Sequence, residues 1–344
     1  MALNHVAIVR LSALGDVTLL LPVVRTLQAA RPHVRITWII GRPAYELLEG
    51  LEGVEFVVID KRRTLSSYRT LYKKLRGRRF DALLALQASA RANLIYPLIR
   101  SPVKLGFDRT RARDAQWLFT NARIRFAREH LLDSFFAFLE YFGITERVLR
   151  WDLPLGAADR AWALSQLSAR AGPLLAINPC ASKRERDWPP ERFIEVIREA
   201  RRRWNVHVVL TGGASLHERA LGARIAQAFP DVVTDLVGRT GAKQLAAVLE
   251  RADCLLAPDT GPVHIAAAMG TPVVGMYAVA PATLSGPYRY QHLAVDRYEQ
   301  AVRQMLGRDP QTVDWRTRVH RGQPMTLIEP ADVLTKLTEV FGSR

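Results

Sequence analysis

Several features that define other classes of protein are scarce in this chain. It has two cysteines among 344 residues, Cys180 and Cys254, too few for a disulfide framework or a cysteine-rich zinc site. No apolar run approaches the roughly 20 residues of a membrane-spanning helix. The amino-terminal segment lacks a charged region followed by an apolar core and a cleavage site, so we expect a cytoplasmic protein.

Acidic residues are also few relative to basic ones. The chain has 33 Asp and Glu residues against 49 Lys and Arg, a formal net charge of +16. The excess is concentrated, because every charged residue from 61 to 79 is basic, and a second basic region extends from Arg100 to Arg128. Such regions attract nucleic acid, anionic lipid or phosphorylated glycolipid, although a solvated basic surface is a simpler explanation.

Short apolar segments alternate with segments of helical spacing along most of the chain. The alternation begins with apolar runs at 5–11 and 34–40, and it starts again at 174–178. Repeated strand and helix in this order predict an α/β protein with mostly parallel sheets. We therefore expect two Rossmann-like domains that face each other across a central cleft, a usual place for ligands.

The same pattern indicates where the domains begin and end. We place an N-terminal domain at 1–155 and a C-terminal domain at 172–330. A final helix at 331–344 has the N-terminal domain as its candidate packing partner.

The most informative segment is Ala-Pro-Asp-Thr-Gly-Pro-Val-His at 257–264. An apolar run precedes it and an alanine-rich helical run follows, so we predict a strand, a tight turn and a helix N-terminus. Unpaired backbone N–H groups and the positive end of the helix dipole favour an anion there. The segment predicts a site for a nucleotide diphosphate around Asp259, Thr260, Gly261 and His264. A helix that Asp259 simply caps is the alternative.

Three other turns carry polar chemistry at predicted strand ends. Asp16 follows the first strand, where its carboxylate could cap a helix or serve as a general base. Glu218 follows the Gly212-Gly213 turn and could accept hydrogen bonds from ribose hydroxyls, although an ordinary turn also explains the glycines. A basic loop before Trp188 could clamp phosphate oxygens, or it could be a solvated charge run. Its candidate residues are Ser182, Lys183 and Arg186.

The order of these motifs resembles glycosyltransferase family 9, the lipopolysaccharide heptosyltransferases. The resemblance extends from Leu11 to Tyr288, and its most specific parts are Leu-Gly-Asp-Val at 14–17 and Asp-Thr-Gly-Pro-Val-His at 259–264. It implies a GT-B fold, an ADP-heptose donor, inversion at the anomeric carbon, and neither a metal ion nor a cofactor. It also implies an anionic acceptor, Kdo-lipid A or heptosylated core, and peripheral association with the cytoplasmic face of the inner membrane.

The resemblance also implies roles for individual residues. Asp16 would deprotonate the acceptor hydroxyl, while Lys61, Arg62 and Arg63 are candidates for acceptor contact. Thr240 falls where the nucleoside pocket of the family begins. The full set of expected donor-binding residues is Ser182, Lys183, Arg186, Glu218, Thr240, Asp259, Thr260, Gly261 and His264.

The chain departs from the family pattern in three places. Arg186 stands where a lysine is common, Ala181 replaces a hydroxyl residue, and the segment 277–281 lacks the usual Gly-Pro-Thr. The open alternatives are transfer of another nucleotide-activated hexose, a GT-B epimerase, and a non-catalytic polyanion-binding protein. We expect no nucleic acid partner, because no recognition motif accompanies the basic tract.

Overall fold

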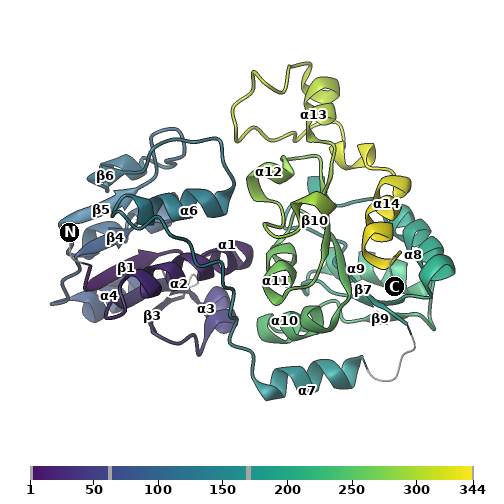
Figure 1. The fold of residues 1–344 in the computed structure, drawn as a ribbon, viewed down its shortest axis with the longest axis horizontal. Helices are drawn as coiled ribbons and strands as arrows, with labels where there is room; N and C mark the ends of the chain where they lie inside the picture. Colours follow the sequence, from purple (N-terminus) through teal and green to yellow (C-terminus); the bar gives the residue numbers. More distant parts are fainter. Residues whose placement is uncertain (1–2, 61–63, 168–171, 343–344) are drawn as a thin grey trace. The chain divides into compact units, whose positions relative to one another are not determined.

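The computed structural model describes residues 3–60, 64–167 and 172–342. The chain divides into two compact units, Met1–Pro154 and Leu155–Arg344, and each is described by itself (Figure 1). The segment between the two expected domains belongs to the second unit, because helix α7 (Ala157–Gln166) packs against α10 (Ala242–Arg251) of that unit.

The first unit is built on one parallel sheet. Its strands stand in the order β3-β2-β1-β4-β5-β6, and every pairing is parallel. The strands are β1 (His5–Val9), β2 (Arg35–Gly41), β3 (Val54–Ile59), β4 (Ala82–Leu84), β5 (Val103–Gly106) and β6 (Ala122–Arg123). The helices are α1 (Leu14–Leu19), α2 (Leu21–Ala30), α3 (Arg42–Leu48), α4 (Thr64–Leu75), α5 (Ala90–Asn93) and α6 (Leu131–Glu140).

The second unit repeats this arrangement. Its sheet has the order β12-β11-β10-β7-β8-β9, again parallel throughout. The strands are β7 (Leu174–Ile177), β8 (His207–Leu210), β9 (Val233–Asp235), β10 (Cys254–Pro258), β11 (Val273–Tyr277) and β12 (Val295–Asp296). The remaining helices are α8 (Pro190–Trp204), α9 (Leu216–Gln227), α11 (Gly261–Met269), α12 (Ala282–Ser285), α13 (Tyr298–Ala301) and α14 (Pro330–Phe341).

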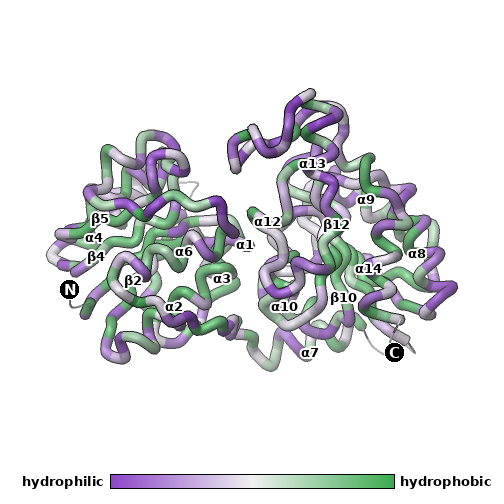
Figure 2. The backbone as a smooth tube through the Cα atoms, turned by 45° about the horizontal axis from the view of Figure 1, so that its top comes forward, coloured by the Kyte–Doolittle hydropathy of each residue, from purple (hydrophilic) through white to green (hydrophobic). Residues whose placement is uncertain are grey.

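Both sheets are covered by helices on their two faces, which explains the character of the strands. A parallel strand that is buried on both sides has no polar face, so it forms a continuous apolar run instead of alternating. The central strand β10 is buried along its whole length, and it is mostly hydrophobic (Figure 2). In the first unit, β2 is buried at every residue after Arg35. Each unit thus has a core of its own, and the predicted α/β class is confirmed.

The final helix α14 packs within the second unit. Its apolar residues Leu337 and Phe341 are buried in the core of that unit, and the ring of Phe341 lies 5.6 Å from that of Trp204 at the end of α8. The apolar face for which we expected the N-terminal domain as partner is therefore used against α8. Among the described residues, no helix combines the length and the apolar character needed to cross a bilayer.

Candidate functional site

The loops that carry the expected donor residues leave one edge of the second sheet. Strands β7 and β10 are neighbours. The chain continues from β7 to β8 on one side of this pair and from β10 to β11 on the other. In doubly wound sheets, ligands bind at the carboxyl ends of such a pair. The loop at 178–189 follows β7, and the turn at 259–260 follows β10 (Figure 1). The sequence motifs therefore lie at the switch point of the second sheet.

Helix α11 begins directly at this edge. Its N-cap residue Thr260 has extended backbone angles (φ −152°, ψ 164°), and its side chain makes no capping hydrogen bond within the described chain. Gly261 and Pro262 open the helix, and His264 is buried in its first turn. Without a side-chain cap, the first backbone N–H groups of the helix remain suited to an anionic ligand.

Arg186 connects the two loops at the switch point. Its Nη1 lies 3.2 Å from Asp259 Oδ2 and donates to the Asp259 backbone carbonyl at 3.2 Å. The Arg186 side chain is 21% exposed and that of Asp259 is 14% exposed, so both are largely buried and Arg186 is slightly the more accessible. Ser182 and Lys183 lie in the same loop and are exposed. Together these groups offer positive charge and hydroxyl groups beside the α11 N-terminus.

Two other expected donor residues have local roles in the structure. Glu218 accepts hydrogen bonds from the Gly213 backbone N–H at 2.8 Å and from the Ser215 hydroxyl at 2.5 Å. Its carboxylate thereby closes the turn that begins α9. Thr240 is half-buried and directly precedes Gly241, the N-cap of α10.

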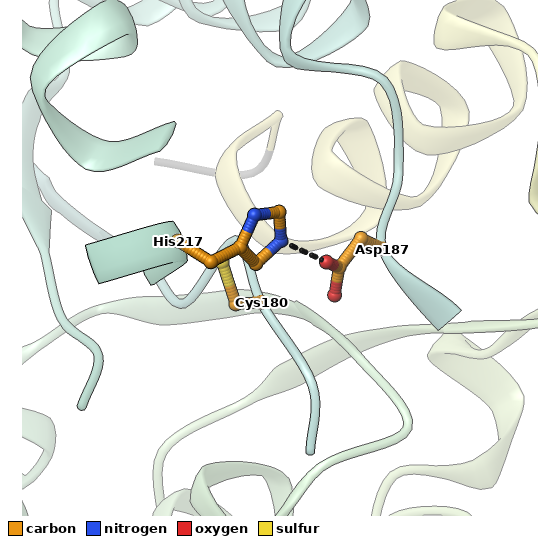
Figure 3. Close-up of side chains that lie close together, drawn as sticks. All are labelled: Cys180, Asp187 and His217. Carbon is orange, nitrogen blue, oxygen red and sulfur yellow. Dashed lines mark hydrogen bonds and ion pairs between the residues drawn. The ribbon is translucent and has the colours of Figure 1, made fainter. Parts of the chain in front are cut away.

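Sequence reasoning missed a cluster formed by Cys180 and Asp187, which flank the basic loop, and His217 of α9 (Figure 3). Asp187 accepts the Ala181 backbone N–H at 2.8 Å through Oδ1, and its Oδ2 lies 2.7 Å from His217 Nε2. The thiol of Cys180 lies beside this pair. Burial, together with the negative charges of Asp187 and Glu218, raises the pKa of Cys180 to about 12. The thiol is therefore protonated at neutral pH and is no nucleophile.

Asp16 lies at the corresponding edge of the first sheet. It is the third residue of α1, and its Oδ2 accepts the Ala13 backbone N–H at 3.0 Å and pairs with the guanidinium of Arg10. The Asp16 side chain is 26% exposed, whereas that of Arg10 is 11% exposed. Both contacts that the described residues make to the carboxylate fall on Oδ2, so Oδ1 is left for another partner.

Arg10 is the positioning residue of this turn, and sequence reasoning missed it. It follows β1 directly, donates to the Leu86 carbonyl just beyond β4, and lies over the Phe135 ring at 5.4 Å from its centre. Nearby, the Leu11 backbone N–H donates to Gln87 Oε1 at 2.7 Å. These two hydrogen bonds link the ends of β1 and β4 near Asp16. The sequence signal that could have identified Arg10 is its position as a basic residue directly after the first strand.

The expected acceptor contacts Lys61, Arg62 and Arg63 lie outside the described residues. The second basic region, from Arg100 to Arg128, lies within the described residues. A depression of about 570 Å³ lies at the carboxyl ends of β5 and β6, and its lining includes Arg109, Arg123 and Arg125. These side chains add positive charge at the sheet edge that also carries Asp16.

The sequence matches a known family over most of its length. Residues 68–315 match the family model of glycosyltransferase family 9 (heptosyltransferase). The lipopolysaccharide core heptosyltransferase OpsX of Haemophilus influenzae is 33% identical over 338 residues, 98% of this chain and 97% of that protein. Lipopolysaccharide heptosyltransferase 1 of Salmonella typhimurium is 25% identical over 86% of this chain and 95% of its own length.

Solved structures show the same fold. A family 9 glycosyl transferase from Veillonella parvula matches with a TM-score of 0.80 at 20% identity, covering 99% of this chain and 98% of that one. ADP-heptose heptosyltransferase II of E. coli matches with a TM-score of 0.75 at 20% identity, covering 98% and 99%. The predicted GT-B fold is confirmed, and the chain belongs to glycosyltransferase family 9 and is a glycosyltransferase.

Proposed function

We propose that this protein transfers heptose from ADP-heptose to an anionic inner-core acceptor of lipopolysaccharide. The similarity to OpsX over nearly the whole chain supports this substrate class. The observation that carries the proposal is the Arg186–Asp259 pair beside the N-terminus of α11. It places a guanidinium group and the start of a helix where the diphosphate of a nucleotide sugar would become a leaving group.

The donor residues have distinct tasks in this proposal. The N–H groups at the start of α11 and the Arg186 guanidinium stabilise charge on the departing ADP, so the reaction requires no divalent metal. Ser182 and Lys183 contact the phosphates. Thr260, Gly261 and His264 surround the diphosphate and the heptose, with Asp259 orienting Arg186. Glu218 and Thr240 receive the ribose and the nucleoside.

Asp16 is the catalytic base in this proposal. The acceptor oxygen forms a bond to the anomeric carbon from the face opposite to ADP, and the bond from that carbon to the phosphate oxygen breaks. ADP leaves with the bonding electrons, and the acceptor proton passes to Asp16, so the configuration at the anomeric carbon inverts. Arg10 holds the carboxylate in place from Oδ2. A positioned base of this kind accelerates a reaction roughly 10²- to 10⁴-fold.

The basic segments of the first unit bind the acceptor in this proposal. Lys61, Arg62 and Arg63 contact its phosphates and carboxylates. The basic residues of α4 and the following turn, such as Arg69 and Lys73, are attracted to the cytoplasmic surface of the inner membrane. Each basic residue close to an anionic membrane contributes about 1 kcal/mol, which gives peripheral association.

A transfer assay with a donor panel tests this function. The purified protein is incubated with Kdo-lipid A or heptosylated core and, in turn, ADP-heptose, ADP-glucose and a UDP-hexose, each with and without EDTA. We expect product from ADP-heptose alone. Transfer from another donor would identify a different hexosyltransferase, and interconversion of a UDP-sugar would identify an epimerase. Binding of RNA without any turnover would favour the polyanion-binding alternative.

A further inference from the structure

Three side chains with metal-binding chemistry lie close together where the two ends of the basic loop meet the start of α9. Cys180 follows β7, Asp187 ends the 3₁₀ turn at Arg184–Arg186, and His217 lies in the first turn of α9. One sulfur, one oxygen and one nitrogen atom of these residues all lie within 4.8 Å of one another. Figure 3 shows the three side chains converging from three separate segments of the unit.

We propose that Cys180, Asp187 and His217 form a binding site for a transition-metal ion of the zinc type. Thiolate, imidazole and carboxylate are the three ligand types that zinc takes in proteins. Zinc binds them at about 2.0 to 2.3 Å, so ligand atoms around a tetrahedral ion lie about 3.3 to 3.6 Å apart. In the cluster, the His217 nitrogen and the Asp187 oxygen are 2.7 Å apart, and all three ligand atoms lie within 4.8 Å of one another.

The surroundings of the three side chains hold them in place for such an ion. Asp187 uses Oδ1 to accept the Ala181 N–H at 2.8 Å, which leaves Oδ2 directed at His217. The Asn178 side chain donates to the Cys180 carbonyl at 2.7 Å and holds the backbone of the cysteine. Hydrogen bonds of this outer kind orient metal ligands and raise affinity.

Binding requires the ligand atoms to adjust their spacing and the Cys180 thiol to lose its proton. The hydrogen bond between His217 and Asp187, 2.7 Å long, must open by about 0.6 Å to reach the spacing of ligands around zinc. The Cys180 thiol must lose its proton to solvent as the sulfur–metal bond forms. His217 is partly exposed, so it offers the ion a way in, and a fourth position stays open for water.

The site has a role apart from the transfer reaction. An ion held by these three residues would link the loop at 180–187 to α9, and the same loop carries Lys183 and Arg186. It would therefore fix the loop without touching the sugar that is transferred. Because the proposal concerns metal binding alone, it stands or falls separately from the proposed function.

Cobalt(II) provides the test, because a thiolate bound to cobalt gives a charge-transfer absorption in the near ultraviolet. The full chain is treated with EDTA, dialysed and titrated with CoCl₂, and ZnCl₂ is then added in competition. We expect one equivalent of cobalt to bind with the thiolate band, and zinc to displace it. Cys180→Ala should abolish the band, and His217→Ala should weaken binding at least tenfold, roughly the scale seen when a metal site loses part of its support.

Two substitutions elsewhere in the chain serve as matched controls. Cys254→Ala removes the other cysteine, which is buried in β10, and His292→Ala removes an exposed histidine. Both variants should bind cobalt as the unchanged protein does. Absence of stoichiometric binding, or a thiolate band that survives in Cys180→Ala, would overturn the proposal. If Cys180→Ala does not fold, cobalt binding is measured in His217→Ala and Asp187→Asn, whose side chains lie nearer the surface. Unchanged binding in both variants would overturn the proposal.

Discussion

The two units repeat one sheet order but differ in which partner of an ion pair is the more exposed at the same edge. Each switch point carries an arginine–aspartate pair, Arg10–Asp16 in the first unit and Arg186–Asp259 in the second. In the first unit the aspartate is the more exposed partner, at 26% against 11%. In the second the arginine is more exposed, at 21% against 14%.

This difference indicates how one architecture can support two halves of a reaction. The parallel sheet decides where a ligand can bind, at the carboxyl ends of its central strands. Within each pair, the partner with the larger exposed fraction is the one that a ligand can reach more easily. In our proposal the first unit thereby offers a base, and the second offers a cation for phosphate.

The largest expected effect comes from removing the carboxylate of Asp16, the more exposed partner of the pair in the first unit. Asp16→Asn should retain a hydrogen bond to Arg10 but cannot accept a proton, so we expect kcat to fall roughly 10²- to 10⁴-fold. Steady-state transfer assays measure this change. Asp159 is the matched control, because it accepts the Gly156 N–H at the same position of α7. Unchanged kcat in Asp16→Asn, or an equal loss in Asp159→Asn, would leave Asp16 as a helix cap alone.

The next largest effect is expected from replacing Arg186, the more exposed partner of the pair in the second unit. Arg186→Ala removes a charge-assisted contact to phosphate and leaves Asp259 without this partner, so the KM for ADP-heptose should rise roughly ten- to a hundredfold. The exposed Arg184 in the same loop is the control, and Arg184→Ala should change this KM little. A KM that moves equally in both variants would show that general loop charge, and not the Arg186–Asp259 pair, binds the donor.

A smaller effect is expected from the acceptor contacts. Replacing Lys61, Arg62 and Arg63 with glutamate should raise the acceptor KM several-fold and leave the donor KM unchanged, because the lost charges meet only the anionic acceptor. Raising the salt concentration should reduce the difference between the variant and the unchanged protein. Parallel loss for both substrates would point to damage to the fold instead.

The smallest effect is expected from replacing Glu218 in the second unit. Glu218 closes its own turn in the structure, so Glu218→Ala should lower the free energy of unfolding by about 0.5 to 2 kcal/mol, as loss of a helix cap does. Chemical denaturation measures this change. Its proposed ribose contact predicts a modest rise in the donor KM as well. A change in stability with an unchanged donor KM would restrict Glu218 to capping.

Parts of this account could be predicted from the sequence because their signals are local. The turn with Asp16 and the turn at 259–264 each combine a strand end, a glycine and a helix start within a few residues. The apolar periodicity likewise predicted the α/β class. Strands β6 and β12 were not predicted, because two residues carry no periodicity.

Other parts depend on contacts between distant segments. Asp187 and His217 are 30 positions apart, and no local pattern indicates that they meet. Arg10 lies six positions before Asp16, but its contact to the Leu86 carbonyl joins segments 76 positions apart. The final helix was predicted from the sequence, but the sequence did not identify α8 as the element on which α14 packs.

A titration of ADP into two variants tests the division between the units most directly. The account predicts that Asp16→Asn binds ADP as tightly as the unchanged protein, and that Arg186→Ala binds it at least tenfold more weakly. Isothermal calorimetry measures both affinities. Loss of ADP binding in Asp16→Asn, or full affinity in Arg186→Ala, would contradict the assignment of the base to the first unit and of the phosphate site to the second.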